Sequence, residues 1–241
     1  GRGRTGAETT AVSLPACVHT MFGAEDGGIG ASAALARLAE RAGVRLAVPD
    51  DAAALCCGTP FSSKGMREAK EVMQARLRAS LIDAAAAADS PLPVVVDAAS
   101  CTEGVLGALA GTDIEVMDAI TFTARHLLDR LEIRRRIGSV TVHPTCSTTQ
   151  LGATGDLEAI ARACAQEVVV PVDWGCCGYA GDRGMLHPEL TASATRAEAA
   201  EVAQRPTDWY VSANRTCELG MRAATGRPYR HVLELLEHAT R

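Results

Sequence analysis

The sequence predicts an α/β protein made of two pseudo-symmetric βαβ-type halves, each with a small parallel sheet. Two observations lead to this fold class. Short β-branched runs alternate along the chain with alanine-rich amphipathic stretches, and strands that alternate with helices form parallel sheets. The cysteines also occur twice in the same order, which indicates an internal duplication. With 241 residues, 47% of them hydrophobic, the chain can bury two small cores.

The duplication is clearest in eight of the nine cysteines. Each set of four has a single cysteine, a pair followed by glycine, and another single cysteine. The two sets are Cys17, Cys56, Cys57 and Cys101, and Cys146, Cys176, Cys177 and Cys217. Their flanks agree as well, because "LPAC" parallels "HPTC" and "CCGTPFSSKGM" parallels "CCGYAGDRGM". We therefore predict two domains, 1–134 and 135–241, which meet near the segment "RRRIG".

The hydrophobic period places the individual elements. In the first repeat the predicted strands are 11–15, 44–48, 93–97 and 114–117, and the predicted helices are 29–42, 64–88, 103–110 and 119–131. In the second repeat the predicted strands are 139–143, 167–171, 209–212 and a short one at 228–230. The helices predicted there are 156–166, 188–204, 215–224 and 231–240.

The paired cysteines all follow the carboxyl end of a predicted strand. In open α/β sheets the ligand crevice lies outside these ends, so each set of four thiols is expected to converge on one place. Helices that start just after the cysteines favour negative charge at their N-termini. Gly58 and Gly178 let the chain turn after each cysteine pair and bring backbone N–H groups close to sulfur.

Four converging thiolates suit either tetrahedral Zn²⁺ or an iron–sulfur cluster. Structural zinc usually takes cysteines two to four residues apart, a spacing that is absent here, whereas adjacent cysteines can bind different irons of one cluster. The spacing favours iron–sulfur and leaves zinc and metal-free thiol redox chemistry open. Cys164 has no counterpart in the first repeat and lies within the predicted helix "LEAIARACAQ", so we expect a buried core thiol there.

Charge and hydropathy disfavour other classes of protein. The net charge is −5 and the basic residues are scattered, which argues against nucleic-acid binding. The sequence has no run of 18 apolar residues, and its first residues lack the apolar stretch of a signal peptide. We expect no transmembrane segment and a cytoplasmic location, with peripheral attachment to the inner membrane face left open.

The segments "CCGTPFSSKG", "CCGYAGDRGMLHPELTASAT" and "VHPTCSTTQLG" resemble the duplicated cysteine-rich domain named for its CCG motif. That domain occurs in heterodisulfide reductase, in the iron–sulfur component of glycolate oxidase and in lactate-utilisation proteins. Over nearly its whole length the chain is similar to the C-terminal region of FAD-linked D-lactate dehydrogenases of the D-2-hydroxyacid type. The segment "GDRGMLHPELTASAT" carries most of this finer similarity.

This resemblance implies an iron–sulfur electron-transfer module of an oxidoreductase. Its partners would be a flavin-binding oxidase domain, in the same full-length chain or complex, and a downstream electron acceptor. FAD would sit in that other domain, because this sequence shows no flavin-binding half and no ferredoxin-like C-x₂-C-x₂-C run. We therefore expect a piece of a larger enzyme that does not oxidise a substrate alone.

The chain departs from the fullest family pattern at one position in each repeat. Heterodisulfide reductase carries C-x-x-C as its last element, whereas this chain has glycine, Gly104 and Gly220, in place of the second cysteine. We expect four-thiolate clusters of the 4Fe–4S type, one or two per chain, rather than five-thiolate ones. A thiol–disulfide site of the heterodisulfide reductase kind and a zinc-stapled interaction domain remain as alternatives.

A few charged residues near the cysteines are candidates for supporting roles. Lys64 and Arg183 each precede a Gly-Met pair after a cysteine doublet, where a cation would raise the potential of a cluster. His19 and His143 lie close to cysteines but at unmatched positions, so we expect them beside the ligands or at the surface. His231 begins the last predicted helix, where it would cap or pack.

Overall fold

The structure is a computed structural model that describes residues 9–86 and 90–241. The chain divides into two compact units. The first comprises residues 1–17 and 35–131, and the second comprises residues 18–34 and 132–241. Segment 18–34 thus belongs to the first repeat in sequence and to the second unit in space.

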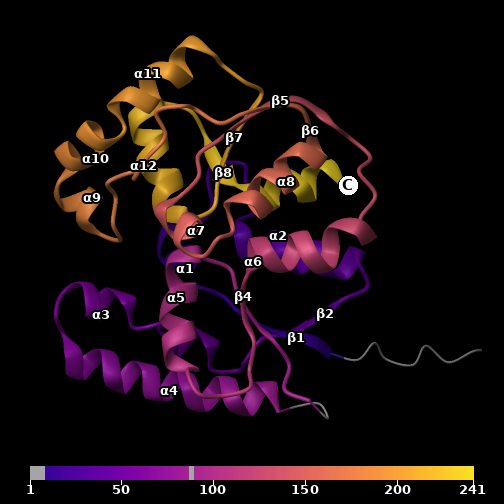
Figure 1. The fold of residues 1–241 in the computed structure, drawn as a ribbon, viewed down its shortest axis with the longest axis vertical. Coiled ribbons are helices and arrows are strands. Elements are labelled where there is room, and N and C mark those ends of the chain that lie inside the picture. Colours follow the sequence, from indigo (N-terminus) through magenta and orange to yellow (C-terminus); the bar gives the residue numbers. More distant parts are fainter. Residues whose placement is uncertain (1–8, 87–89) are drawn as a thin grey trace, which may run out of the picture. The chain divides into compact units, whose positions relative to one another are not determined.

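The first unit is built on a four-stranded parallel sheet (Figure 1). Its strands are β1 (Thr9–Leu14), β2 (Arg45–Ala47), β3 (Val94–Val96) and β4 (Val116–Asp118), in the order β2-β1-β3-β4. In the register, Val12 of β1 pairs with Val94 of β3, and Val94 pairs with Val116 of β4. All three valines of β3 are fully buried, as expected for a central parallel strand covered on both faces.

Helices of the first unit pack against this sheet. They are α3 (Thr59–Ser63), α4 (Arg67–Ala85), α5 (Ala99–Ala108) and α6 (Ala119–Phe122), with the 3₁₀ helices η1 (Ala52–Ala54) and η3 (Leu128–Arg130) and the π-helix η2 (Thr123–Leu127). Helices α1 (Cys17–Phe22) and α2 (Ala31–Arg41) span the points where the chain passes between units. Helix α4 contacts α5 and β1, and it buries Leu77 and Leu81.

The second unit repeats the same topology. Its strands are β5 (Ile137–Val142), β6 (Ala165–Val169), β7 (Trp209–Ser212) and β8 (Tyr229–His231), all parallel, in the order β6-β5-β7-β8. Its helices are α7 (Cys146–Gln150), α8 (Thr154–Cys164), α9 (Arg183–Leu186), α10 (Pro188–Ala194), α11 (Arg196–Gln204), α12 (Arg215–Thr225) and α13 (Val232–Ala239). The predicted α/β fold with two similar halves and small parallel sheets is confirmed.

Differences from the predicted elements are local. The sequence analysis missed α1, α3, α7 and α9, because helices of four to six residues are too short to show a hydrophobic period. The predicted helix 188–204 is two helices that meet at Thr195. The hydroxyl of Thr195 donates to the carbonyl of Thr191 at 2.7 Å, a side-chain hydrogen bond that often bends helices.

His231 forms the N-cap of α13, in agreement with its predicted capping role. Its Nδ1 accepts the backbone N–H of Leu233 at 3.3 Å, and its side chain is almost fully buried. Burial, followed by the nearby His19, lowers the pKa of His231 to about 3, although a hydrogen bond to the Ala213 backbone acts in the other direction. The imidazole is therefore neutral in the folded protein.

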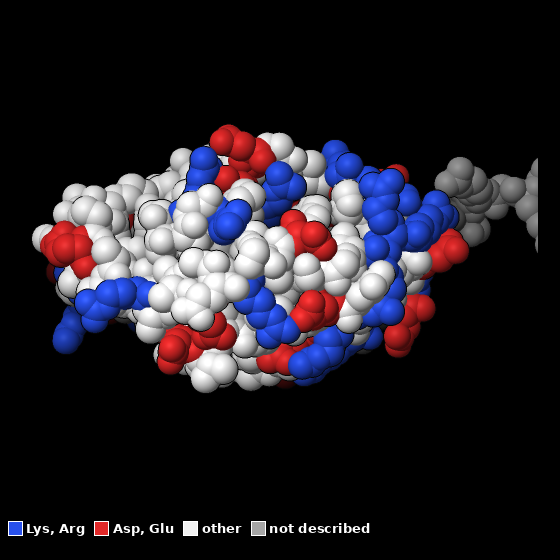
Figure 2. Space-filling model, turned by 90° about the horizontal axis from the view of Figure 1, so that it is seen from above, with Lys and Arg blue, Asp and Glu red and all other residues white. Residues whose placement is uncertain are grey.

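Within residues 9–86 and 90–241, no helix combines the length and the apolar character that a membrane crossing needs. On the face drawn in Figure 2, acidic and basic side chains are interspersed. Ion pairs at the surface of the described residues include Arg162 with Glu158.

Candidate metal centres

The loops that carry the first cysteine set are fixed by hydrogen bonds to the elements around them. Oδ1 of Asp97, just past β3, accepts the N–H of Ala16 at 2.7 Å and so holds the turn that leads into Cys17. On α4, the Gln74 amide donates to the carbonyls of Cys57 and Gly104 at 3.4 and 3.1 Å. Three segments that are distant in sequence are thereby held at the carboxyl end of one sheet.

The four thiols of the first unit form a contiguous chain of contacts. Cys17 contacts Cys56, Cys56 contacts Cys57, and Cys57 contacts Cys101. Cys57 and Cys101 are buried, whereas Cys17 and Cys56 are partly exposed. Cys17 is the first residue of α1 and Cys101 the third of α5. The site therefore has an inner pair of sulfurs and an outer pair that reaches toward the surface.

The thiols of the first site differ in pKa, and so in how readily they lose a proton. Hydrogen bonds from Cys17 and then Cys57 lower the pKa of Cys56 far below its ordinary value. The same hydrogen bond to Cys56, together with burial, raises the pKa of Cys17, and hydrogen bonds to Cys101 and Cys56 raise the pKa of Cys57. One thiolate thus forms readily, and further ones require a cation to offset their mutual repulsion.

The second unit gathers its thiols in an equivalent way. Cys146 contacts Cys176, Cys176 contacts Cys177, and Sγ of Cys177 lies 3.0 Å from Sγ of Cys217. Cys177 and Cys217 are buried, and Cys146 and Cys176 are exposed. Cys146 is the first residue of α7, and Cys217 is the third residue of α12. The inner and outer sulfur positions of the first unit therefore recur in the second.

Two side-chain contacts help to fix the second site. Thr145 caps α7 through a reciprocal capping box with Thr148, which sets the position of Cys146. Tyr179 packs against the buried pair of Cys177 and Cys217, and this aromatic ring covers the inner sulfurs from one side.

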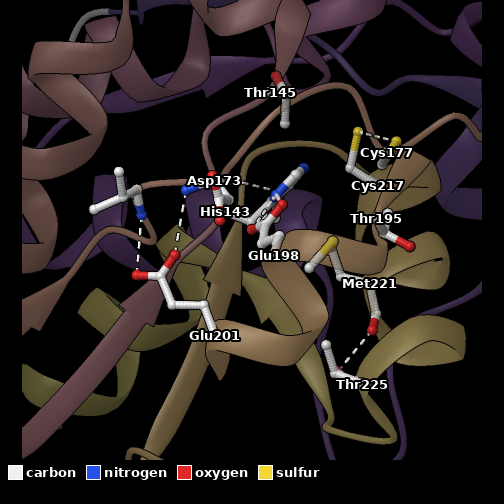
Figure 3. A network of polar contacts seen from close by, with 12 residues as sticks. His143, Thr145, Asp173, Cys177, Thr195, Glu198, Glu201, Cys217, Met221 and Thr225 are labelled. Carbon is white, nitrogen blue, oxygen red and sulfur yellow. Dashed lines mark hydrogen bonds and ion pairs between the residues drawn. The ribbon is translucent and has the colours of Figure 1, made fainter. Parts of the chain in front are cut away.

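The second site also contains a histidine that lies beside the buried cysteine pair, one of the two places in which the sequence analysis expected it. His143 is fully buried, and its Nδ1 lies 2.7 and 2.9 Å from the two carboxylate oxygens of Glu198 on α11 (Figure 3). A ring nitrogen of His143 and the sulfurs of Cys177 and Cys217 form a group whose ligand atoms are all within 4.8 Å of one another. Burial would lower the pKa of His143, but Cys177 and Glu198 together raise it to about 9.

Both glycines that follow the cysteine doublets behave as predicted. Gly58 and Gly178 have φ values of 85° and 70°, in the left-handed region that favours glycine. The N–H of Gly58 donates to Sγ of Cys56, and that of Gly178 donates to Sγ of Cys176, each at 3.4 Å. Such N–H···S contacts stabilise a negatively charged sulfur, whether it is free or bound to a metal.

Gly104 and Gly220, which stand where heterodisulfide reductase has a further cysteine, lie against the second cysteine of each doublet. A Cβ added at Gly104 would come within 2.6 Å of the Cys57 carbonyl oxygen and 3.1 Å of the Cys57 Cβ. At Gly220 the nearest atom would be the Cys177 Cβ at 3.4 Å, an ordinary contact. The first site is therefore closed to a side chain at this position, and the second is open to a small one.

Three other residues that the sequence analysis singled out lie outside the two cysteine clusters or at the surface. Lys64 is the exposed C-cap of α3, and Arg183 is the exposed first residue of α9; their role as cations beside a cluster stays a prediction. Cys164 is fully buried at the end of α8, and burial raises its pKa to about 12. It is a core thiol, as predicted.

Comparisons with known proteins agree with the duplication. The cysteine-rich domain family CCG matches two regions, residues 15–104 and 140–222, one in each repeat. A search of curated proteins found no match. One similar solved structure is PH1733, an aspartate racemase homologue from Pyrococcus horikoshii OT3, with 10% identity and a TM-score of 0.36 over 95% of this chain and 96% of that chain. A similarity this low supports no argument, whereas the two family matches cover most of the sequence. The chain therefore belongs to the cysteine-rich domain (CCG) family.

Proposed function

We propose that the chain is the iron–sulfur electron-transfer module of an FAD-dependent D-2-hydroxyacid dehydrogenase of the D-lactate type. Family membership and the His/Cys cluster indicate a redox or metal-binding module. The iron–sulfur cofactor, the flavin partner and the substrate are our proposal. The observation that carries it is the convergence of four thiols at the carboxyl end of each sheet, with the same inner and outer arrangement in both units.

The residues present fit a small cluster bound by cysteine sulfur. Each site offers four thiols linked by contacts from one to the next, a backbone N–H directed at an outer sulfur, and raised pKa values that a metal cation would reverse. The close approach of Gly104 to Cys57 leaves no room for a fifth cysteine in the first unit. These features favour four thiolate ligands, Cys17, Cys56, Cys57 and Cys101 in the first unit and Cys146, Cys176, Cys177 and Cys217 in the second.

A bound iron–sulfur cluster supplies one-electron chemistry, which suits a step between a two-electron flavin and an acceptor. In the reaction we propose, oxidation of the hydroxy acid to the oxo acid delivers two electrons and two protons to the flavin of the partner domain. This chain's residues hold the relay in place. Its buried sulfurs limit access by water, and its outer sulfurs bring the site to the surface where donor and acceptor can approach.

The test compares two cysteine substitutions in anaerobically reconstituted protein. Cys177→Ser replaces a ligand thiolate by a hydroxyl and should remove the iron and acid-labile sulfide of one site while the other is retained. Cys164→Ser is the matched control, because Cys164 is equally buried but packs in the core at the end of α8. It should keep the full iron content and lose about 1–3 kcal/mol of stability for the buried hydroxyl.

Other outcomes would decide between the alternatives. Equal iron in the two variants would mean that the cysteine doublet binds none, and bound zinc without sulfide would favour a structural metal domain. A metal-free protein that cycles between dithiol and disulfide at Cys177 and Cys217 would favour the thiol–disulfide alternative. The proposed electron donor is tested by adding reduced FAD to the reconstituted protein. The absorbance of the clusters then shows whether they become reduced.

A further inference from the structure

The two sites differ in one possible donor atom. Alignment of "LPAC" with "HPTC" places His143 of the second repeat opposite Leu14 of the first. Both residues are buried next to the turn that leads into the first cysteine of their set. The first unit therefore has a hydrocarbon side chain at the position where the second has an imidazole.

The surroundings of His143 orient this imidazole for metal binding. The Glu198 carboxylate accepts from Nδ1 at 2.7 Å, and the Ser212 hydroxyl donates to the His143 backbone carbonyl at 3.0 Å. The Glu198 carboxylate holds a proton on Nδ1, so a metal that displaces the proton on Nε2 binds the lone pair of that nitrogen, and a carboxylate behind a histidine is the usual support of a metal-binding imidazole. Figure 3 shows the ring between Glu198 and the cysteine pair.

The other ring nitrogen interacts with a cysteine of the site. Among the residues that the structure describes, the buried Nε2 of His143 has no partner at hydrogen-bond distance and angle, and Cys177 acts on the imidazole electrostatically. A ring nitrogen of His143 lies within 4.8 Å of the sulfurs of Cys177 and Cys217, and since Nδ1 faces Glu198 we assign this position to Nε2. Donors bound to one tetrahedral ion at about 2.0–2.3 Å lie about 3.5–3.8 Å from one another. The two sulfurs are 3.0 Å apart, so they would separate by less than about 1 Å to share one metal with the imidazole.

A packing role alone does not account for this arrangement. Burial of an imidazole and a carboxylate carries a desolvation penalty that a leucine avoids, as the first unit shows at Leu14. The pair His143 and Glu198 is fully removed from water, with side-chain exposures of 0% and 2%. A metal bound to Nε2 would satisfy the remaining polar atom of the pair.

We infer that Nε2 of His143 binds the metal of the second site together with Cys177 and Cys217. The first site then has thiolate ligands only, and the second has thiolate and imidazole ligands. This inference rests on the proposed metal-binding function and adds a difference between its two sites. An imidazole that takes the place of a thiolate removes one negative charge, and in that case the second site has the higher reduction potential when it holds a cluster.

The test uses Co²⁺ alone, so that it does not depend on cluster assembly. The chain carries Cys57→Ser to disable the first site, and the reduced protein is titrated with Co²⁺ under anaerobic conditions. Proton NMR should show one exchangeable resonance, the Nδ1–H of a Co²⁺-bound imidazole, shifted far outside the normal window. This resonance should be absent in the same chain with His143→Leu, which copies Leu14 of the first repeat.

Two further variants separate metal support from general packing. Glu198→Gln keeps an oxygen that can accept from Nδ1 but removes the charge, and it should weaken Co²⁺ binding about 10- to 100-fold. Glu158→Gln removes a carboxylate of the same unit that pairs with Arg162, and it should leave Co²⁺ affinity unchanged.

The inference is overturned if Co²⁺ binds with thiolate charge-transfer absorption but no shifted imidazole resonance, or if Glu198→Gln binds Co²⁺ as tightly as the parent chain. The shifted resonance is looked for in the chain that keeps His143. This result therefore does not depend on how well the His143→Leu variant folds. Failure of the proposed function looks different. A chain that binds Co²⁺ through His143 but never assembles iron and sulfide retains this inference and loses the iron–sulfur proposal.

Discussion

At the scale of single residues, equivalent positions in the two repeats have come to differ. Gly104 and Gly220 occupy the same place in the sequence motif, yet only Gly104 is in close contact with the backbone of its cysteine doublet. Likewise Leu14 and His143 share a position but differ in chemistry. The duplication therefore fixes where the sites are, and individual side chains decide what each site can accept.

Alanine at the two equivalent glycines should have opposite effects on stability. In a helix interior, glycine to alanine stabilises by about 0.5–1 kcal/mol when there is room. We expect this gain for Gly220→Ala, whereas Gly104→Ala should destabilise by about 1–3 kcal/mol because its Cβ would overlap the Cys57 carbonyl. Denaturant unfolding of the two variants measures both values. Equal changes would show that the two sites are packed alike.

The buried His231 should make unfolding depend on pH. Its folded-state pKa of about 3 lies below the ordinary value of 6.5, so below pH 6.5 the unfolded chain takes up a proton that the folded chain does not. The contribution of this residue to stability is therefore present above pH 6.5 and is lost as the pH falls toward 3.

The matched variant is His231→Asn, which can still cap α13 but does not titrate. Between pH 6.5 and 4.5 the wild type should lose about 1.4 kcal/mol per pH unit relative to this variant. The measurement is the free energy of unfolding of both proteins at several pH values. A difference that stays constant with pH would contradict a neutral buried imidazole.

At the scale of secondary-structure elements, the cysteine doublets depend on close packing between a loop and a helix. Gly178 lies against α10, where an added Cβ would come within 3.0 Å of the Leu190 carbonyl oxygen and 3.1 Å of the Ala194 Cβ. Gly58 faces α4 instead, where the nearest atoms belong to the flexible side chains of Gln74 and Lys70. The second doublet therefore tolerates less change than the first.

The variant Gly178→Ala tests this packing, with Gly152→Ala as its control. Both glycines have φ near +70°, but no atom lies within 4 Å of a Cβ built at Gly152. The control should lose about 1–2 kcal/mol from left-handed backbone strain. Gly178→Ala should lose clearly more and should also bind less metal, because its doublet must shift. Thermal unfolding and metal content per chain measure the two effects, and equal losses would argue against tight packing at the doublet.

At the scale of the whole molecule, the ligands of each site come from a single unit. All four thiols of the first site lie in the first unit, and those of the second site, with His143 and Glu198, lie in the second. Residues 18–34 cross from one repeat to the other unit, but none of them supplies a cysteine. Metal binding at one site should therefore proceed without the other.

Metal content should accordingly be additive between the sites. Cys57→Ser and Cys177→Ser should each remove the metal of one site, and the double variant should remove all of it. Because bound metal stabilises only the folded state, a chelator should lower the unfolding temperature of the wild type more than that of either single variant. Metal analysis and thermal unfolding with and without chelator give both values. Loss of all metal in one single variant would show that the two sites depend on each other.

The sequence by itself determined the fold class and the duplication, and it predicted where the eight repeated cysteines gather. Alternation of strands with helices requires parallel sheets, and cysteines that follow strands must meet at one end of such a sheet. It also determined the turns at Gly58 and Gly178, because glycine alone adopts their conformation at little cost.

Only the tertiary structure decided the environment of individual atoms. The pairing of His143 with Glu198 joins residues that are 55 positions apart, and the overlap at Gly104 depends on a backbone 47 positions earlier. The transfer of residues 18–34 to the second unit also has no local signal. Such features arise from long-range packing, which periodicity and motif spacing do not report, because they describe only neighbours along the chain.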